Sequence, residues 1–295
     1  MRPNDYLWWK NRVKNKSSIA DWLQQARTEL HPRIPQEPAS SLYALLEKSY
    51  NQPRAWLLAH PDAILTEQQL LMLEKDLQAL LQGKPLAYIL QYWDFYGMRF
   101  HVSPDVLIPR PESELLVETA LEILSLQNSP SLIADVGTGS GCIAAAIAAH
   151  RSDASIIASD ISFNALRVAS QNFRHHTLQE RVFLLQCNLL SGVEAPFDLI
   201  CANLPYIPSH AVTSLEVSRF EPSLALDGGE DGMHIMRALL DQSHTRLTPY
   251  ASILLEMQFD QANAVSEMAR LHFPGAQMII KKDLANRDRL LVIQL

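Results

Sequence analysis

From residue 111 to the C-terminus, short apolar strands alternate with amphipathic helices, and this alternation constrains the fold more than any other feature. Apolar strands of this kind are typical of a parallel sheet that is covered by helices on both faces. The clearest strands are SLIADV, SIIASDI, VFLLQC and FDLICAN. The two closing segments, QMIIKKD and RLLVIQL, are separated by a short polar turn, so we expect them to pair antiparallel. The sequence therefore predicts an α/β doubly wound sheet.

The preceding residues have a different pattern, which predicts a separate helical domain. Apolar residues recur at three- and four-residue spacing in SIADWLQQARTEL, SLYALLEKSY and TEQQLLMLEKDLQALLQ. Ser18, Ser41 and Thr66 are candidate N-caps for these helices. The aromatic and β-branched segment YILQYWDFYGMRFHV then predicts a β-hairpin. The expected organisation is a helical domain at 1–82, a hairpin linker at 83–110 and an α/β domain at 111–295.

Glycine is scarce, and six of the ten glycines lie in two clusters, around Gly139 and around Gly229. The first cluster forms the loop D-V-G-T-G-S-G between a predicted strand and helix, where glycine permits tight turns. Asp160 ends the next strand, where an acid is suited to bind ribose hydroxyls. Both a dinucleotide and S-adenosylmethionine (SAM) contain such a ribose, so the loop alone does not choose the cofactor. The candidate cofactor-binding residues here are Gly137, Thr138, Gly139, Ser140, Gly141 and Asp160.

A second motif follows the strand FDLICAN and favours methyl transfer over nicotinamide chemistry. Ligands of open α/β sheets gather at the carboxyl ends of the strands, where this turn begins. The turn reads N-L-P-Y, and it offers the amide oxygen of its asparagine, a nearby backbone carbonyl and the aromatic face of its tyrosine. These groups suit a planar NH₂ group, either a carboxamide or the exocyclic amine of a base. The two acceptors could hold the hydrogens of that NH₂ group while the NH₂ nitrogen faces an electrophile. The candidate catalytic and substrate-binding residues are Asn203, Leu204, Pro205 and Tyr206.

The sequence resembles the release factor glutamine methyltransferases, which methylate the glutamine of the Gly-Gly-Gln motif in peptide chain release factors. The resemblance covers nearly the whole chain and rests on VSPDVLIPRPESELLVE, DVGTGSG, NLPYI and RFEPSLALDGGEDG. It implies the Rossmann-like, seven-stranded sheet of class I SAM methyltransferases, S-adenosyl-L-methionine as cofactor, and release factor binding by residues 1–82. It also adds Asn188, Leu189 and Asn203 to the expected cofactor site.

Two positions depart from the family pattern. Leu204 stands where the family usually has the first proline of Asn-Pro-Pro-Tyr, so its carbonyl remains but the turn is expected to be less rigid. Asn188 stands where many methyltransferases have an aspartate facing the adenine amine; its oxygen can still accept a hydrogen bond, and weaker cofactor binding is expected. Because N-L-P-Y also resembles the motif of adenine dimethyltransferases, methylation of an exocyclic base amine of RNA or DNA is the alternative function.

Charge argues against a nucleic-acid substrate. Residues 1–90 carry a net charge of +2 and the rest of the chain −9, whereas phosphate binding needs many Lys and Arg. We therefore expect no direct DNA binding. The longest uncharged apolar stretch, Cys142–Ala149, is too short to span a bilayer, so no membrane association is expected. The chain has three cysteines and no C-x-x-C pattern, which predicts a cytoplasmic protein. Its histidines lack the spacing of metal ligands, so we expect no metal site. A monomer is expected.

Four further residues carry two interpretations each. Glu112 and Glu114 are ordinary first-turn acids, although the family resemblance places their linker over the cofactor cleft. Phe100 is either a hairpin packing residue or a cofactor contact. Glu256 ends the strand ASILLEM, where it could cap a helix or face the cleft.

Overall fold

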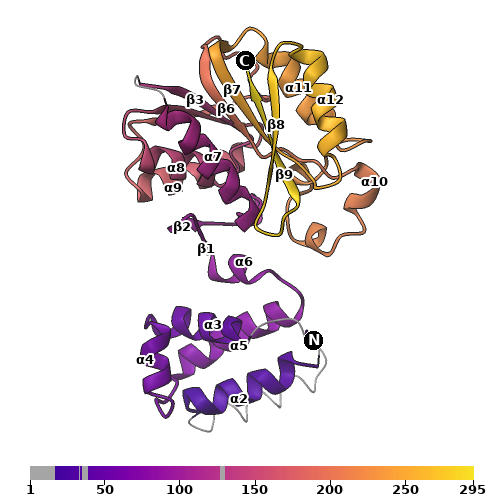
Figure 1. The fold of residues 1–295 in the computed structure, drawn as a ribbon. Coiled ribbons are helices and arrows are strands. Elements are labelled where there is room, and N and C mark those ends of the chain that lie inside the picture. Colours follow the sequence, from indigo (N-terminus) through magenta and orange to yellow (C-terminus); the bar gives the residue numbers. More distant parts are fainter. Residues whose placement is uncertain (1–16, 33, 35–38, 127–129) are drawn as a thin grey trace. The chain divides into compact units, whose positions relative to one another are not determined.

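The structure is a computed structural model that describes residues 17–32, 34, 39–126 and 130–295. It divides into two compact units, Met1–Gln91 and Tyr92–Leu295, drawn in Figure 1. Residues 1–16 of the expected helical domain lie outside the described residues. The boundary between the units falls at Gln91, later than the expected domain end at residue 82, because helical structure continues to Leu90.

The smaller unit is helical, and its packing follows the predicted apolar spacing. Ser18 and Thr66 cap two helices through reciprocal capping boxes, which confirms both predictions. Ser41 is not a cap: Ala39 precedes its helix, and Ser41 is buried within the first turn. The helices are α2 (Ile19–Leu30), α3 (Ser40–Tyr50), α4 (Arg54–Ala59), α5 (Glu67–Leu81) and α6 (Leu86–Leu90).

The predicted hairpin is present but shorter than expected. It consists of β1 (Tyr92–Phe95) and β2 (Met98–His101), paired antiparallel. The turn residues Tyr96 and Gly97 have φ values of 49° and 71°, as in the two-residue turns whose twist matches that of the strands. The preceding residues Tyr88–Leu90, predicted as strand, belong to α6, which begins directly after Pro85.

The larger unit contains a seven-stranded sheet in the order β5-β4-β3-β6-β7-β9-β8. Neighbouring strands from β5 to β7 run parallel, and β9 runs antiparallel to both β7 and β8, as predicted for the closing pair. This arrangement confirms the predicted doubly wound fold. The strands are β3 (Leu132–Val136), β4 (Ser155–Asp160), β5 (Val182–Gln186), β6 (Phe197–Ala202), β7 (Leu247–Glu256), β8 (Gln277–Lys282) and β9 (Asp288–Gln294).

Helices cover both faces of this sheet (Figure 1). Successive strand residues belong to two different buried clusters, one on each face of the sheet. Ile133 belongs to the first cluster, and the next residue, Ala134, belongs to the second. The helices of the first cluster are α7 (Glu114–Ser125), α8 (Cys142–His150) and α9 (Phe163–His175). That second cluster includes α11 (His234–Ser243) and α12 (Ala262–His272). Two buried faces explain why the strands are continuously apolar.

Shorter elements connect the layers. They are the 3₁₀ turns η1 (Pro111–Ser113), η2 (Glu216–Arg219) and η3 (Ser223–Ala225), and the short helix α10 (Ser209–Val212). None of the helices in the described residues is both long and apolar enough to cross a membrane.

Candidate active site

A cavity of about 220 Å³ opens at the carboxyl edge of the sheet, where β3, β4 and β6 end. Its walls come from the glycine loop after β3, the end of β4, the turn after β6 and the linker before η1. Gly141 and Tyr206 lie beside the cavity without lining it. The predicted site residues that line it are Gly137, Thr138, Gly139, Ser140, Asp160, Asn188, Leu189, Asn203, Leu204 and Pro205.

The glycine loop adopts a backbone that other residues rarely take. Gly137, Gly139 and Gly141 have φ values of 73°, 55° and 81°, in the left-handed region that glycine enters without steric cost. A Cβ on Gly141 would lie 2.6 Å from the ring of Phe173. Gly141 therefore serves close packing beneath the loop, while Gly139 offers its bare backbone to the cavity.

Asp160, at the end of β4, stabilises this loop through hydrogen bonds. One carboxylate oxygen accepts from the backbone N–H of Gly139 at 2.9 Å and the other from Ser162 at 2.8 Å. Burial raises the pKa of this carboxyl, while these hydrogen bonds oppose the rise. A carboxylate has about four acceptor positions, so Asp160 retains capacity for hydroxyl donors from a ligand in the cavity.

Asp135 supports the loop from beneath, a role that the motif pattern alone does not reveal. It is 1% exposed and accepts from the Thr138 hydroxyl at 2.6 Å and from the Ala144 N–H at 3.3 Å. Burial raises the pKa of Asp135 to about 6.

The side chain of Asn203 is oriented by a residue that sequence reasoning missed. Its Nδ2 donates to the hydroxyl of Ser113 at 2.9 Å. Ser113 is 2% exposed and lies at the end of η1. The only sequence signal for it was its place in the linker I-P-R-P-E-S-E.

Leu204, the departure from the family motif, packs against the glycine loop. It is 3% exposed, and its Cδ2 atom lies 3.0 Å from the position that a Cβ on Gly137 would occupy. Side-chain packing therefore constrains this turn where the family's proline would constrain it through its ring.

The second glycine cluster lies directly against the same turn. The Ile207 N–H donates to the Leu226 carbonyl at 3.1 Å, and the Gly228 N–H donates to the Ile207 carbonyl at 2.8 Å. A Cβ on Gly228 would lie 2.7 Å from the Pro205 carbonyl oxygen. Glycine is needed here because two backbones approach more closely than a side chain allows.

The linker and the R-F-E-P segment also meet. Glu221, 4% exposed, forms an ion pair with Arg110 and accepts from the Ile108 N–H at 3.4 Å. Arg110 lines the cavity. Two segments that carry the family resemblance therefore contact each other in the fold.

The hairpin is joined to the glycine loop through Asn172 of α9. Its Oδ1 accepts from the His101 N–H at 2.7 Å, and its Nδ2 donates to the carbonyls of His101 at 3.0 Å and Ser140 at 2.8 Å. Phe100 is fully buried in the core cluster beside α7, α8 and α9, and does not line the cavity. The structure therefore supports its packing interpretation.

The two first-turn acids differ in their surroundings. Glu114 accepts from the Tyr96 N–H at 2.8 Å and so links α7 to the hairpin turn. Glu112 is exposed.

Glu256 lies buried beside the site, at the end of β7. It is 2% exposed, and burial raises its pKa to about 7, opposed by a side-chain hydrogen bond with Ser113. Burial, followed by the nearby Glu256 charge, raises the pKa of Tyr206 to about 12, so its phenol is neutral. Helix α12 begins only at Ala262 and is preceded by Gln261, so Glu256 does not cap it.

The described residues contain no group of three or more His, Cys, Asp or Glu side chains arranged to hold a metal ion. The thiol of Cys142 lines the cavity, and burial raises its pKa to about 12, which makes it a neutral apolar contact.

Comparisons with known proteins agree with this geometry. Residues 112–221 match the family model described as methyltransferase small domain, and residues 21–90 match the PrmC N-terminal domain. A release factor glutamine methyltransferase from Nitratidesulfovibrio vulgaris is 35% identical over 283 residues, which cover 93% of this chain and 94% of the relative. A protein of the same name from Moorella thermoacetica is 42% identical over 209 residues, covering 70% of this chain and 74% of that one.

A solved structure shows the same class I methyltransferase fold. It is a T. thermophilus 16S rRNA N2 G1207 methyltransferase in complex with AdoMet and guanosine, with a TM-score of 0.50 at 19% identity. The match covers 69% of this chain and 49% of that chain.

Proposed function

The chain belongs to the release factor glutamine methyltransferase family, and on that premise we propose that it methylates the side-chain amide nitrogen of the glutamine in the Gly-Gly-Gln motif of peptide chain release factors. The observation that carries this proposal is the side chain of Asn203, held by Ser113 at the wall of a cavity that the glycine loop also lines. This juxtaposition brings an amide-binding turn and a cofactor loop to one edge of the sheet.

The cavity suits SAM. Gly139 presents no side chain to it, and Asp160 has acceptor capacity for ribose hydroxyls. Asn188 and Leu189 line the same cavity, where the Asn188 oxygen would accept from the adenine amine. When bound, SAM supplies an electrophilic methyl group on a sulfonium.

The chain's own contribution is to bind and align the target amide. An amide nitrogen is a weak nucleophile because its lone pair is delocalised, and it becomes electron-poor as it attacks. The Asn203 oxygen and the Leu204 carbonyl would accept its two hydrogens and stabilise that developing charge. Tyr206, neutral because of its raised pKa, would pack against the flat amide. Alignment of the nitrogen with the methyl group supplies a further part of the rate enhancement.

Substitution of Asn203 tests this mechanism. Asn203→Ala removes an interaction that strengthens in the transition state, so turnover on a purified release factor should fall about 10²- to 10³-fold. The dissociation constant for SAM should change much less, because Asp160 and the glycine loop remain. Radiolabelled methyl transfer measures the first quantity and calorimetry the second. Methylation by Asn203→Ala at the wild-type rate would refute the assigned role.

We further propose that the N-terminal helices recognise the release factor, within the region 1–82 expected from the sequence. The match of residues 21–90 to the PrmC N-terminal domain supports a separate function for them. A fragment that begins at Tyr92, the start of the larger compact unit, should bind SAM with the wild-type dissociation constant but methylate release factor poorly. Loss of SAM binding by a folded fragment would contradict this division.

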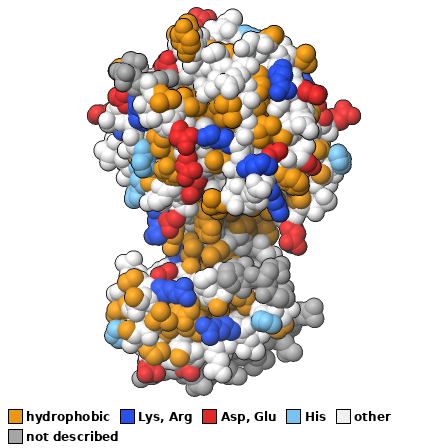
Figure 2. All heavy atoms as spheres, in the orientation of Figure 1, with side chains coloured by type: hydrophobic (Ala, Val, Ile, Leu, Met, Phe, Trp, Pro, Cys, Tyr) orange, Lys and Arg blue, Asp and Glu red, His pale blue; other side chains and the backbone are white. Residues whose placement is uncertain are grey.

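Methylation of a nucleic-acid base is not favoured. The two relatives are named for release factors, and Figure 2 shows acidic and basic side chains interspersed over the drawn face of the larger unit. We also propose that the enzyme is monomeric, that its substrate is a protein and that it does not bind DNA directly. Three free cysteines suit the reducing cytoplasm, where we place the reaction.

A further inference from the structure

The turn 203–206 ends at a peptide group that is hydrogen-bonded on both sides. The Tyr206 carbonyl accepts from Nε2 of Gln261 at 3.0 Å, and the N–H of the next residue, Ile207, donates to the Leu226 carbonyl at 3.1 Å. Both groups belong to one planar unit, so the two bonds together fix its direction. The position of Tyr206 at the end of the turn therefore depends on a side chain 55 residues away in the sequence.

The direction of the Gln261 carboxamide is determined by its second partner. Oε1 of Gln261 accepts from the Gln258 N–H at 3.1 Å, while the Gln261 N–H donates to the Gln258 carbonyl at 3.0 Å. A backbone N–H can only donate and a backbone carbonyl can only accept, so the carboxamide satisfies both of its partners in one orientation alone. In that orientation Nε2 of Gln261 faces the Tyr206 carbonyl.

Gly232 shows how closely this contact is enclosed. A Cβ on Gly232 would overlap the Tyr206 carbonyl oxygen and would lie 2.8 Å from Nε2 of Gln261. The φ value of Gly232 is 73°, in a region that residues with a side chain rarely adopt. The second glycine cluster therefore leaves the room that the Gln261 side chain needs to reach the turn.

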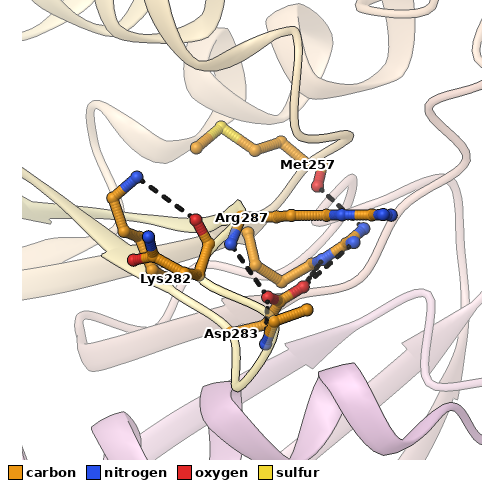
Figure 3. Close-up of polar contacts among 7 residues, drawn as sticks. Met257, Lys282, Asp283 and Arg287 are labelled. Atoms are coloured by element: carbon orange, nitrogen blue, oxygen red, sulfur yellow. Dashed lines mark hydrogen bonds and ion pairs between the residues drawn. The ribbon is translucent and has the colours of Figure 1, made fainter.

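The loop that carries Gln261 is anchored on the β8–β9 hairpin. The N–H of Met257, the first residue after β7, donates to the Arg289 carbonyl at 2.9 Å. The Met257 carbonyl accepts in turn from the Arg289 guanidinium at 3.5 Å. Arg289 also pairs with Asp283 at 3.2 Å, and both contacts of the guanidinium are drawn in Figure 3. The loop from Met257 to Gln261 therefore starts from a fixed point on β9.

We propose that Gln261 is a positioning residue that holds the turn at the wall of the cavity by donating to the Tyr206 carbonyl. Ser113 holds the start of the turn through Asn203, and Gln261 holds its end. The Leu204 carbonyl, one of the two acceptors proposed for the target amide, lies between these two points. The inference rests on the proposed function, because it assigns to Gln261 the alignment of a turn that binds the target amide.

Loss of this bond should act on turnover and not on cofactor binding. Among the described residues, Gln261 is the only hydrogen-bond donor to the Tyr206 carbonyl. Without it the end of the turn is free to shift, and a misplacement of about 1 Å can lower a rate about 10²-fold. Gln261 does not line the cavity, so the contacts available to SAM remain.

The test compares two substitutions of similar length in the full-length protein, with a purified release factor as substrate at pH 8. Gln261→Glu introduces a carboxylate that is ionised at this pH; it keeps an acceptor for the Gln258 N–H but cannot donate to the Tyr206 carbonyl. Gln261→Met loses both contacts. Each variant should lower kcat about 10- to 100-fold. The KM for release factor and the dissociation constant for SAM should stay within about twofold.

Gln258→Met is the matched control. Gln258 lies in the same loop and is half-buried like Gln261, but its side chain makes no hydrogen bond to the described residues. The substitution leaves the Gln258 N–H in place, so kcat should stay within about twofold of the wild-type value. Thermal unfolding of each variant shows that it is folded at the assay temperature.

Each outcome bears on one claim. Wild-type kcat in Gln261→Glu would overturn the positioning role, because this variant loses only the contact with Tyr206. A raised KM with unchanged kcat, or equal losses in Gln261→Met and Gln258→Met, would overturn it as well. Should one Gln261 variant misfold, the kcat of the other carries the same test. If the wild-type protein methylates no release factor, the proposed function fails instead, and the two failures are thereby distinguished.

Discussion

Adding one methyl group at Gly228 should displace the turn 203–206, which we propose binds the target amide. In Gly228→Ala the new Cβ would lie 2.7 Å from the Pro205 oxygen and 2.8 Å from Tyr206 Cα, both backbone atoms. Ordinary contacts between carbon atoms are about 3.5–4.0 Å, so the contact with Tyr206 Cα requires one backbone to move by about 0.7 Å or more. A misplacement of about 1 Å can cost about 10²-fold in rate, and overpacking typically costs about 1–3 kcal/mol of stability.

Gly275→Ala is the matched control. Like Gly228, Gly275 lies outside the left-handed region, so alanine brings no φ strain at either position. Among the described residues other than its two chain neighbours, none has a heavy atom within 4 Å of a Cβ on Gly275. This substitution should change stability by less than about 1 kcal/mol, in the stabilising direction, because it restricts the unfolded chain.

The assay compares methyl transfer to release factor, SAM affinity and thermal unfolding for both variants. Gly228→Ala should lose about 10²-fold in turnover and unfold at a lower temperature, with SAM affinity nearly unchanged because β3, β4 and the first glycine loop are untouched. Wild-type turnover and stability in Gly228→Ala would show that the close approach of the two backbones does not position the turn.

Two further predictions concern the carboxyl groups of Asp160 and Glu256. Asp160→Ala should weaken SAM binding by about 1.5–3 kcal/mol, measured by calorimetry, because it removes a charged acceptor; Asp153→Ala, at an exposed site, should not, and equal affinities would remove Asp160 from the cofactor site. The rise of the Glu256 pKa from 4.5 to about 7 means that the folded state binds its proton more tightly than the unfolded state. Its contribution is therefore present below pH 4.5 and lost as pH rises through about 7, so wild type should lose about 2–3 kcal/mol between pH 5 and pH 8 relative to Glu256→Gln. Parallel stability curves from denaturant titrations would contradict that pKa.

The sequence by itself determined the features that depend on near neighbours along the chain. The alternation of apolar strands and helices predicted the doubly wound sheet, and Ser18 and Thr66, as candidate N-caps, predicted two helix starts. Motif positions also located the cavity, since a residue that ends a parallel strand must lie at the carboxyl edge of the sheet. Where local signals compete, prediction failed: the β-branched and aromatic segment after Pro85 begins as helix α6.

Only the tertiary structure decided which distant side chains meet. Asn203 and Ser113 are 90 residues apart in sequence, and Asn172 and His101 are 71 apart, yet each pair is hydrogen-bonded. Such contacts depend on how the linker and hairpin fold back against the strand ends, and no periodicity in the sequence records that packing. The same holds for Glu256: a glutamate at a strand end is unremarkable in sequence, and it acquires a pKa of about 7 only because the fold removes it from water.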